Sequence, residues 1–129
     1  MAHNGIEYGL MQSYAEGFEL MKTKTEMNLD VAKIAEVWSH GSVIRSWLLQ
    51  LISTALKQDA SLSGIKSSVD DSGEGRWFVK ESIDLAVPVP AIAHSLQVRF
   101  RSRQEQPFGE KLLAVLRKQF GGHSTESDR

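Results

Sequence analysis

Residues 3–22 read HNGIEYGLMQSYAEGFELMK, and one face of this stretch is apolar. Its apolar side chains recur at three- and four-residue steps: Ile6, Leu10, Tyr14, Phe18 and Met21. That spacing is the period of an α-helix, so the stretch predicts an amphipathic helix over residues 3–22. Gly5 and Gly9 lie one turn apart in it and would let a neighbouring backbone approach closely.

A polar face lies beside the apolar one. At about 100° per residue, Asn4, Glu7, Tyr8 and Met11 fall on the same side of the helix. Spacing alone favours an ordinary helix N-terminus with a carboxylate near the positive end of the dipole. The functional alternative is an amide, a carboxylate and a phenol that converge on a polyhydroxylated ligand.

The rest of the chain predicts further helices and no clear strand, so the expected fold is all-α: a bundle-like domain of about six helices with a polar C-terminal tail. Asp30 is the expected N-cap of the second helix and Ser42 that of the third, while Pro90 suits the first turn of the fifth. The third helix carries a wide apolar stripe and is expected to be the central, buried one. The expected ranges are 31–41, 43–57, 77–86, 90–101 and 108–120.

Composition narrows the possible functions. The 129 residues suggest one domain, with 41% hydrophobic and 24% charged residues. A net charge of -1 and a pI near 6.4 give no electrostatic reason to bind nucleic acid. The chain has no cysteine, which suits a cytoplasmic location. It has no apolar run of membrane-spanning length, so no membrane partner is expected. We also expect no metal site, because the four histidines lack metal-ligand spacing: His3, His40, His94 and His123.

Two further motifs have ordinary interpretations when each is taken alone. DSGEGRW, residues 71–77, contains Gly-x-Gly but lacks the third glycine and the preceding strand of a dinucleotide-binding loop. The basic residues near the C-terminus resemble a solvated set, although the planar fork of arginine is well suited to phosphate. These residues are Arg99, Arg101, Arg103, Arg117 and Lys118.

Together these motifs resemble the C-terminal helical domain of decarboxylating 6-phosphogluconate dehydrogenase. HNGIEYGLMQSYAEGFEL is similar to that family's signature helix. DSGEGRW followed by ESIDLAVPVPAIAHSLQVRF resembles its second conserved block, and RKQFGGH its C-terminal segment. The three motifs occur in the family's order, and their residues are most similar to those of its shorter-chain members. The resemblance implies oxidation of 6-phospho-D-gluconate at C3 with NADP or NAD, loss of CO₂ and formation of D-ribulose 5-phosphate in the pentose phosphate pathway.

The resemblance also implies roles for individual residues. Glu7 matches the acid that protonates the enediol carbon after CO₂ leaves. Five residues match substrate-binding positions: Asn4, Tyr8, Arg99, Arg117 and His123. His3 matches a histidine beside the site. Arg117 and His123 belong to a C-terminal tail that would act in trans in a homodimer or a higher homo-oligomer.

The chain departs from the family pattern in two respects. The family's catalytic lysine would fall just ahead of Met1, and no Gly-rich coenzyme-binding half is present. Residues 1–129 are therefore expected to be the substrate-binding and dimerisation domain, inactive alone, with the coenzyme bound mainly by an N-terminal Rossmann domain. Longer members also have Lys-Gly-Thr-Gly-Lys-Trp where this chain has Ser72-Gly73-Glu74-Gly75-Arg76-Trp77. Because Glu74 is anionic, it is not expected to bind phosphate directly.

Two alternatives remain open from the sequence. One is a related β-hydroxyacid dehydrogenase domain with another substrate, which would share the helical plan; the retained Arg99, Arg117 and His123 favour a phosphorylated sugar acid instead. The other is a non-catalytic helical association module. The tryptophans Trp38, Trp47 and Trp77 and the wide apolar helix would suit such a module.

Overall fold

The computed structural model describes residues 1–121, and in this range the chain is helical with no strand. Six α-helices and one 3₁₀ turn follow one another: α1 Ala2–Thr23, η1 Thr25–Met27, α2 Val31–Gly41, α3 Trp47–Gln58, α4 Glu74–Asp84, α5 Pro90–Ser102 and α6 Phe108–Gly121. The all-α prediction is therefore confirmed. None of these helices is long and apolar enough to cross a membrane.

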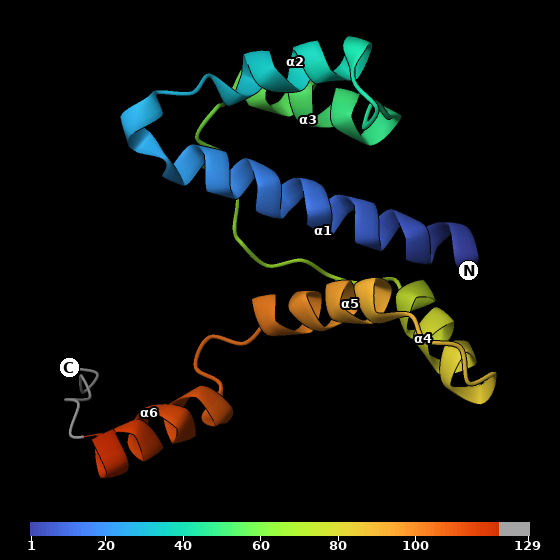
Figure 1. Ribbon diagram of the computed structural model, residues 1–129, viewed down its shortest axis with the longest axis vertical. Coiled ribbons are helices and arrows are strands. Elements are labelled where there is room, and N and C mark those ends of the chain that lie inside the picture. The colour runs from blue at the N-terminus through green and yellow to red at the C-terminus, as the bar shows by residue number, and fades with distance from the viewer. Residues whose placement is uncertain (122–129) are drawn as a thin grey trace.

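Helix α1 is the axis of the domain. The α2–α3 pair lies on one side of it and the α4–α5 pair on the other (Figure 1). In the described part of the chain, the extensive helix contacts join α1 to α2, α4 and α5, α2 to α3, and α4 to α5. Helix α6 takes part in none of them and extends beyond the end of α5 (Figure 1).

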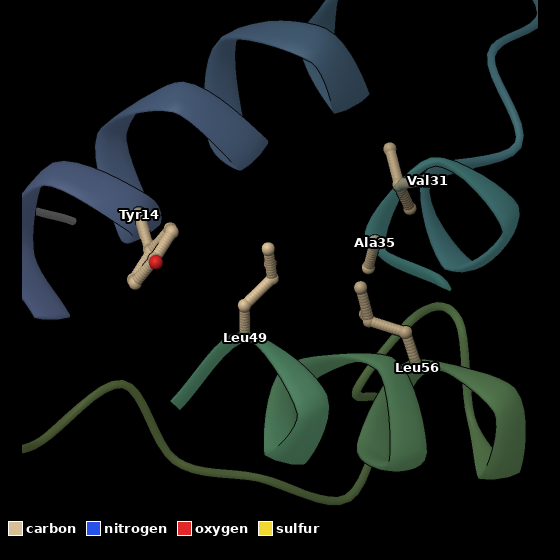
Figure 2. Packing of buried hydrophobic residues seen from close by; sticks show 5 residues of the cluster. All are labelled: Tyr14, Val31, Ala35, Leu49 and Leu56. Atoms are coloured by element: carbon tan, nitrogen blue, oxygen red, sulfur yellow. The ribbon is translucent and has the colours of Figure 1, made fainter. Parts of the chain in front are cut away.

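The main hydrophobic cluster lies between α1, α2 and α3. Tyr14 of α1, Val31 and Ala35 of α2, and Leu49 and Leu56 of α3 are its buried members (Figure 2). Leu49 and Ala35 are completely buried. The cluster fixes the second half of α1 and leaves its first half to pack against α4 and α5.

Local signals in the sequence give the starts of two helices correctly. The Asp30 carboxylate accepts a hydrogen bond from the Lys33 backbone N–H at 3.0 Å and caps α2, as predicted. Pro90 is the first residue of α5, where its missing N–H is not needed. Helix α4 begins at Glu74, three residues earlier than the sequence predicted, and ends at Asp84.

The prediction for the third helix is wrong in two respects. Helix α3 begins at Trp47, and its cap is Ser46, whose hydroxyl accepts from the Leu49 N–H at 3.0 Å. The reason is a distant contact: the Tyr14 hydroxyl donates to the Ile44 carbonyl and lies 2.9 Å from Oγ of Ser46, which holds Ser46 where it caps the helix. Nor is α3 the central helix. α1 has that place, and Trp47 of α3 is 73% exposed.

Candidate functional site

Small residues let the first half of α1 lie close to α4. A Cβ on Gly5 would come 3.0 Å from the Phe78 ring, and a Cβ on Gly75 would come 2.5 Å from Cε2 of Tyr8. Gly5 therefore has the close-packing role expected from the sequence, although its neighbour is a side chain. At Gly9 the nearest atom, on Ile92, would be 3.9 Å away, which is ordinary contact. Gly75 provides the space that the Tyr8 ring occupies.

Gly75→Ala should therefore lower the free energy of unfolding by roughly 1–3 kcal/mol, as overpacking usually does. The new methyl group would collide with a ring that is only 5% exposed. Gly17→Ala is the matched control, because no atom lies within 4 Å of its Cβ position on α1. That variant should gain about 0.5–1 kcal/mol. Urea denaturation measures both, and equal stabilities would contradict the proposed fit of Tyr8 against Gly75.

Tyr8 and Arg99 form the centre of the candidate site. The Arg99 guanidinium carbon lies 3.7 Å from the centroid of the Tyr8 ring, a close cation–π contact. Arg99 Nη1 donates to the Asp70 carbonyl at 3.1 Å, and Nη2 lies 3.5 Å from Sδ of Met11. The fold thus brings an arginine of α5 onto the polar face of α1, joining residues that are far apart in the sequence.

The other predicted residues of α1 lie beside this pair. Asn4 and Glu7 are half-buried and lie within one helical turn of Tyr8. The Nδ1 atom of His3 is 3.2 Å from Oδ1 of Asn4, so His3 is an exposed neighbour of the site. Within residues 1–121, the Glu7 carboxylate forms no ion pair. No charged side chain in that range therefore holds its oxygens in place.

An acidic residue that the sequence analysis did not single out lies close to Arg99. The Asp71 side chain is only 4% exposed and accepts from Arg76 Nε at 2.6 Å and Arg76 Nη2 at 3.1 Å. Arg103 Nη1 donates to the same carboxylate at 3.2 Å. The hydrogen bond from Arg76 is the main reason that the pKa of Asp71 lies below its usual value, and Arg103 acts in the same direction. The sequence contains one signal that could have indicated this contact: a pair of acidic residues, Asp70 and Asp71, and a set of alternating arginines at positions 99, 101 and 103.

This arrangement separates the roles of neighbouring arginines. Arg76 and Arg103 share the charge of Asp71 and lie over the Phe100 ring, at 4.4 and 5.4 Å from its centroid. Arg99 has no carboxylate partner among the residues that the structure describes. Its positive charge is therefore uncompensated, which is the condition that favours an anionic ligand.

The structure does not bring every predicted residue to this site. Arg117 is exposed on α6, which has no extensive contact with α1, α4 or α5 and is joined to α5 by the exposed ion pair between Arg101 and Glu110 at 3.4 Å. His123 lies outside the described residues. Arg117 is thus remote from Tyr8 and Arg99 within one chain. In the described range, no group of three or more His, Asp or Glu residues could hold a metal ion.

Comparison with known proteins identifies the family. The model of the C-terminal domain of 6-phosphogluconate dehydrogenase matches residues 1–127. The chain belongs to the 6-phosphogluconate dehydrogenase family. The family membership expected from the three sequence motifs is therefore confirmed, and the match covers every residue of the Tyr8–Arg99 site.

Curated relatives agree with this assignment. The chain is 48% identical over 126 residues to the YqeC protein of Bacillus subtilis, covering 98% of this chain and 42% of that protein. It is 44% identical over 124 residues to an NAD(+)-dependent, decarboxylating 6-phosphogluconate dehydrogenase of Haloferax volcanii, covering 95% of this chain and 41% of the relative. A decarboxylating 6-phosphogluconate dehydrogenase of Lactococcus lactis is 31% identical over 135 residues, with 98% and 28% covered. The chain thus spans less than half the length of these relatives.

Proposed function

We propose that this domain binds 6-phospho-D-gluconate in an enzyme that oxidises the substrate at C3, releases CO₂ and yields D-ribulose 5-phosphate. The observation that carries the proposal is the uncompensated Arg99 guanidinium, 3.7 Å from the Tyr8 ring on the polar face of α1. Family membership supports the choice of substrate. Arg99 and Tyr8 would bind the phosphate, and Asn4 would hold the sugar acid by its amide.

Glu7 is the residue that we propose for proton transfer. A 3-keto acid loses CO₂ readily because the adjacent carbonyl stabilises the electron pair left behind. The resulting enediol must then gain a proton at carbon, and a carboxyl group close to that carbon can provide it. Glu7 is half-buried, next to Tyr8 in the chain, and within residues 1–121 it has no ion-pair partner to hold it away from a ligand.

The hydride acceptor, NAD or NADP, would be bound outside these 129 residues. The residues present do not fit a dinucleotide: the only Gly-x-Gly is Gly73-Glu74-Gly75, and no strand precedes it. Moreover, the space at Gly75 is taken by the Tyr8 ring. The roles proposed for this chain's own residues, substrate binding and proton transfer, therefore need no contact with the coenzyme.

We further propose that a second copy of the chain completes the site. Helix α6 carries five exposed apolar residues: Phe108, Leu112, Leu113, Val115 and Leu116. Phe108 is 78% exposed and Leu113 is 65% exposed, which is unfavourable for a helix that remains in water. Burial of α6 against a symmetric partner would cover these side chains and would carry Arg117 and His123 to the partner's Tyr8 and Arg99.

Arg99→Ala tests the phosphate assignment. In the whole enzyme it should weaken 6-phosphogluconate binding by roughly 1.5–3 kcal/mol, the range for a hydrogen bond to a charged group. Binding of gluconate, which lacks the phosphate, should hardly change. Titration calorimetry with both ligands measures the difference. Arg101→Ala is the matched control, since Arg101 is exposed and its contacts are with Gln104 and Glu110.

Two results would contradict the proposal in different ways. Equal losses for gluconate and 6-phosphogluconate would exclude a phosphate role for Arg99 and favour a relative that acts on an unphosphorylated hydroxy acid. No binding of either ligand by the unmodified enzyme would favour the non-catalytic association module.

A further inference from the structure

The segment 69–71 crosses from the α3–α4 loop onto α5 and is held there by side chains of two helices. The Val69 N–H donates to Oγ of Ser102 at 3.0 Å, and the Val69 carbonyl accepts from Nη1 of Arg103 at 3.0 Å. Two residues later, the Asp71 carboxylate bridges Arg76 of α4 and Arg103, the residue that follows α5. Both ends of the three-residue segment are thus anchored.

The residue between these anchors contacts the proposed phosphate-binding arginine. The Asp70 carbonyl accepts the hydrogen bond from Arg99 Nη1 at 3.1 Å. Because Val69 and Asp71 are both fixed, the position of this carbonyl is fixed as well. Arg99 therefore has a rigid acceptor on one side, the Tyr8 ring against its face and Met11 beside its second nitrogen.

We propose that Asp71 is a positioning residue, which holds the Asp70 carbonyl in place and so presents the Arg99 guanidinium to the substrate phosphate. The inference rests on the proposed function, because it takes Arg99 as the phosphate ligand. An arginine side chain that is free in solution must lose much of its rotamer freedom when it binds. The Asp71 bridge orders Arg99 during folding, so that this loss does not weaken substrate binding.

Asp71 is the most deeply buried member of this ion-paired group. Its side chain is 4% exposed, against 54% for Arg76 and 27% for Arg103. Without this buried acceptor, both guanidinium groups lose a hydrogen-bond partner inside the protein. We therefore expect residues 69–71 to detach from α5. The pKa of Asp71 is lowered chiefly by the Arg76 hydrogen bond, so the carboxylate stays charged to a lower pH than a free aspartate does.

Asp71→Asn in the whole enzyme is the first test. Asparagine keeps the size of the side chain but has no charge and turns an NH₂ group toward the two arginines. The KM for 6-phosphogluconate should rise roughly three- to tenfold, the loss expected when one long side chain must be ordered on binding. The kcat should stay nearly constant, because the groups that transfer protons are untouched. An unchanged KM would overturn the proposal.

A double variant separates positioning from general destabilisation. If Asp71 acts through Arg99, Asp71→Asn should raise the KM no further once Arg99→Ala is present. An effect that does not act through Arg99 would raise the KM by the same factor in both backgrounds and would overturn the inference. Asp59→Asn is the matched control, because Asp59 also accepts several hydrogen bonds, from Ser61 and Ser63, but lies in another part of the loop. It should leave the KM unchanged.

Ser102→Ala gives a milder second route if Asp71→Asn does not fold. It removes the hydroxyl that accepts from the Val69 N–H and donates to the Arg99 backbone carbonyl at 2.8 Å, so it loosens both the segment and the residue that the segment positions. It should raise the KM in the same direction by a smaller factor. This increase should also disappear in the Arg99→Ala background, and its persistence there would count against positioning. The two proposals fail separately. If Arg99→Ala does not discriminate phosphate, the proposed function fails; if it does and neither Asp71→Asn nor Ser102→Ala raises the KM, only the positioning inference fails.

Discussion

Glu7→Gln should slow turnover of the whole enzyme by roughly 10²–10⁴-fold, the usual contribution of a positioned general acid or base. The amide has nearly the shape of the carboxyl group, so 6-phosphogluconate should still bind. It cannot deliver a proton to the enediol carbon, and water would have to do so instead. Steady-state kinetics should therefore show a large fall in kcat with a small change in KM.

The matched control for this variant lies on the same helix. Glu16→Gln changes a carboxylate of α1 that is exposed and accepts a hydrogen bond from Gln12 at 2.8 Å. It should leave kcat and KM unchanged. If Glu7→Gln raised only the KM, Glu7 would be a binding residue and the proton would come from elsewhere. If both variants lowered kcat alike, the effect would come from the charge of α1 rather than from the position of Glu7.

Local chemistry was enough to predict most of the helices. The period of α1, the Asp30 cap and Pro90 at the start of α5 all depend on residues within one or two turns. The start of α3 depends on Tyr14, whose hydroxyl contacts Ile44 and Ser46 some thirty residues away. The sequence analysis named Ser42 as the cap, whereas Ser46, which contacts the Tyr14 hydroxyl at 2.9 Å, is the residue that caps α3.

The candidate site also contains residues that local sequence could place and residues that only tertiary contacts place. Helical spacing alone places Asn4, Glu7 and Tyr8 on one face of α1. Nothing in the local sequence shows that Arg99 lies against Tyr8; that expectation came from the family resemblance, and the structure gives its geometry. Asp71 was missed because its partners are far apart in the sequence, Arg76 in α4 and Arg103 just after α5, and a Ser-, Asp- and Gly-rich segment usually indicates only a loop.

Mixing two inactive variants should restore activity if the C-terminal segment completes the partner's site. One variant would carry Arg117→Ala with His123→Ala, and the other Glu7→Gln. Arg117 lies on α6, which has no extensive contact with the helices that carry Tyr8 and Arg99, so we expect it to act at the partner's site rather than at that of its own chain. His123 follows in the residues beyond those that the structure describes. Each homodimer of either variant would have a defect in both of its sites.

A mixed dimer distributes these defects unequally. The subunit with intact Glu7 receives the intact C-terminal segment of its partner, so its site is complete. The site of the other subunit has both defects. Random pairing of equal amounts should therefore give about a quarter of the activity of the unmodified enzyme, since half of the dimers are mixed and each has one intact site. The mixture should be dissociated and reassociated, and mixed dimers should be verified by two different affinity tags. If the segment acts within its own chain, every site of a verified mixed dimer keeps one defect, and mixing restores nothing.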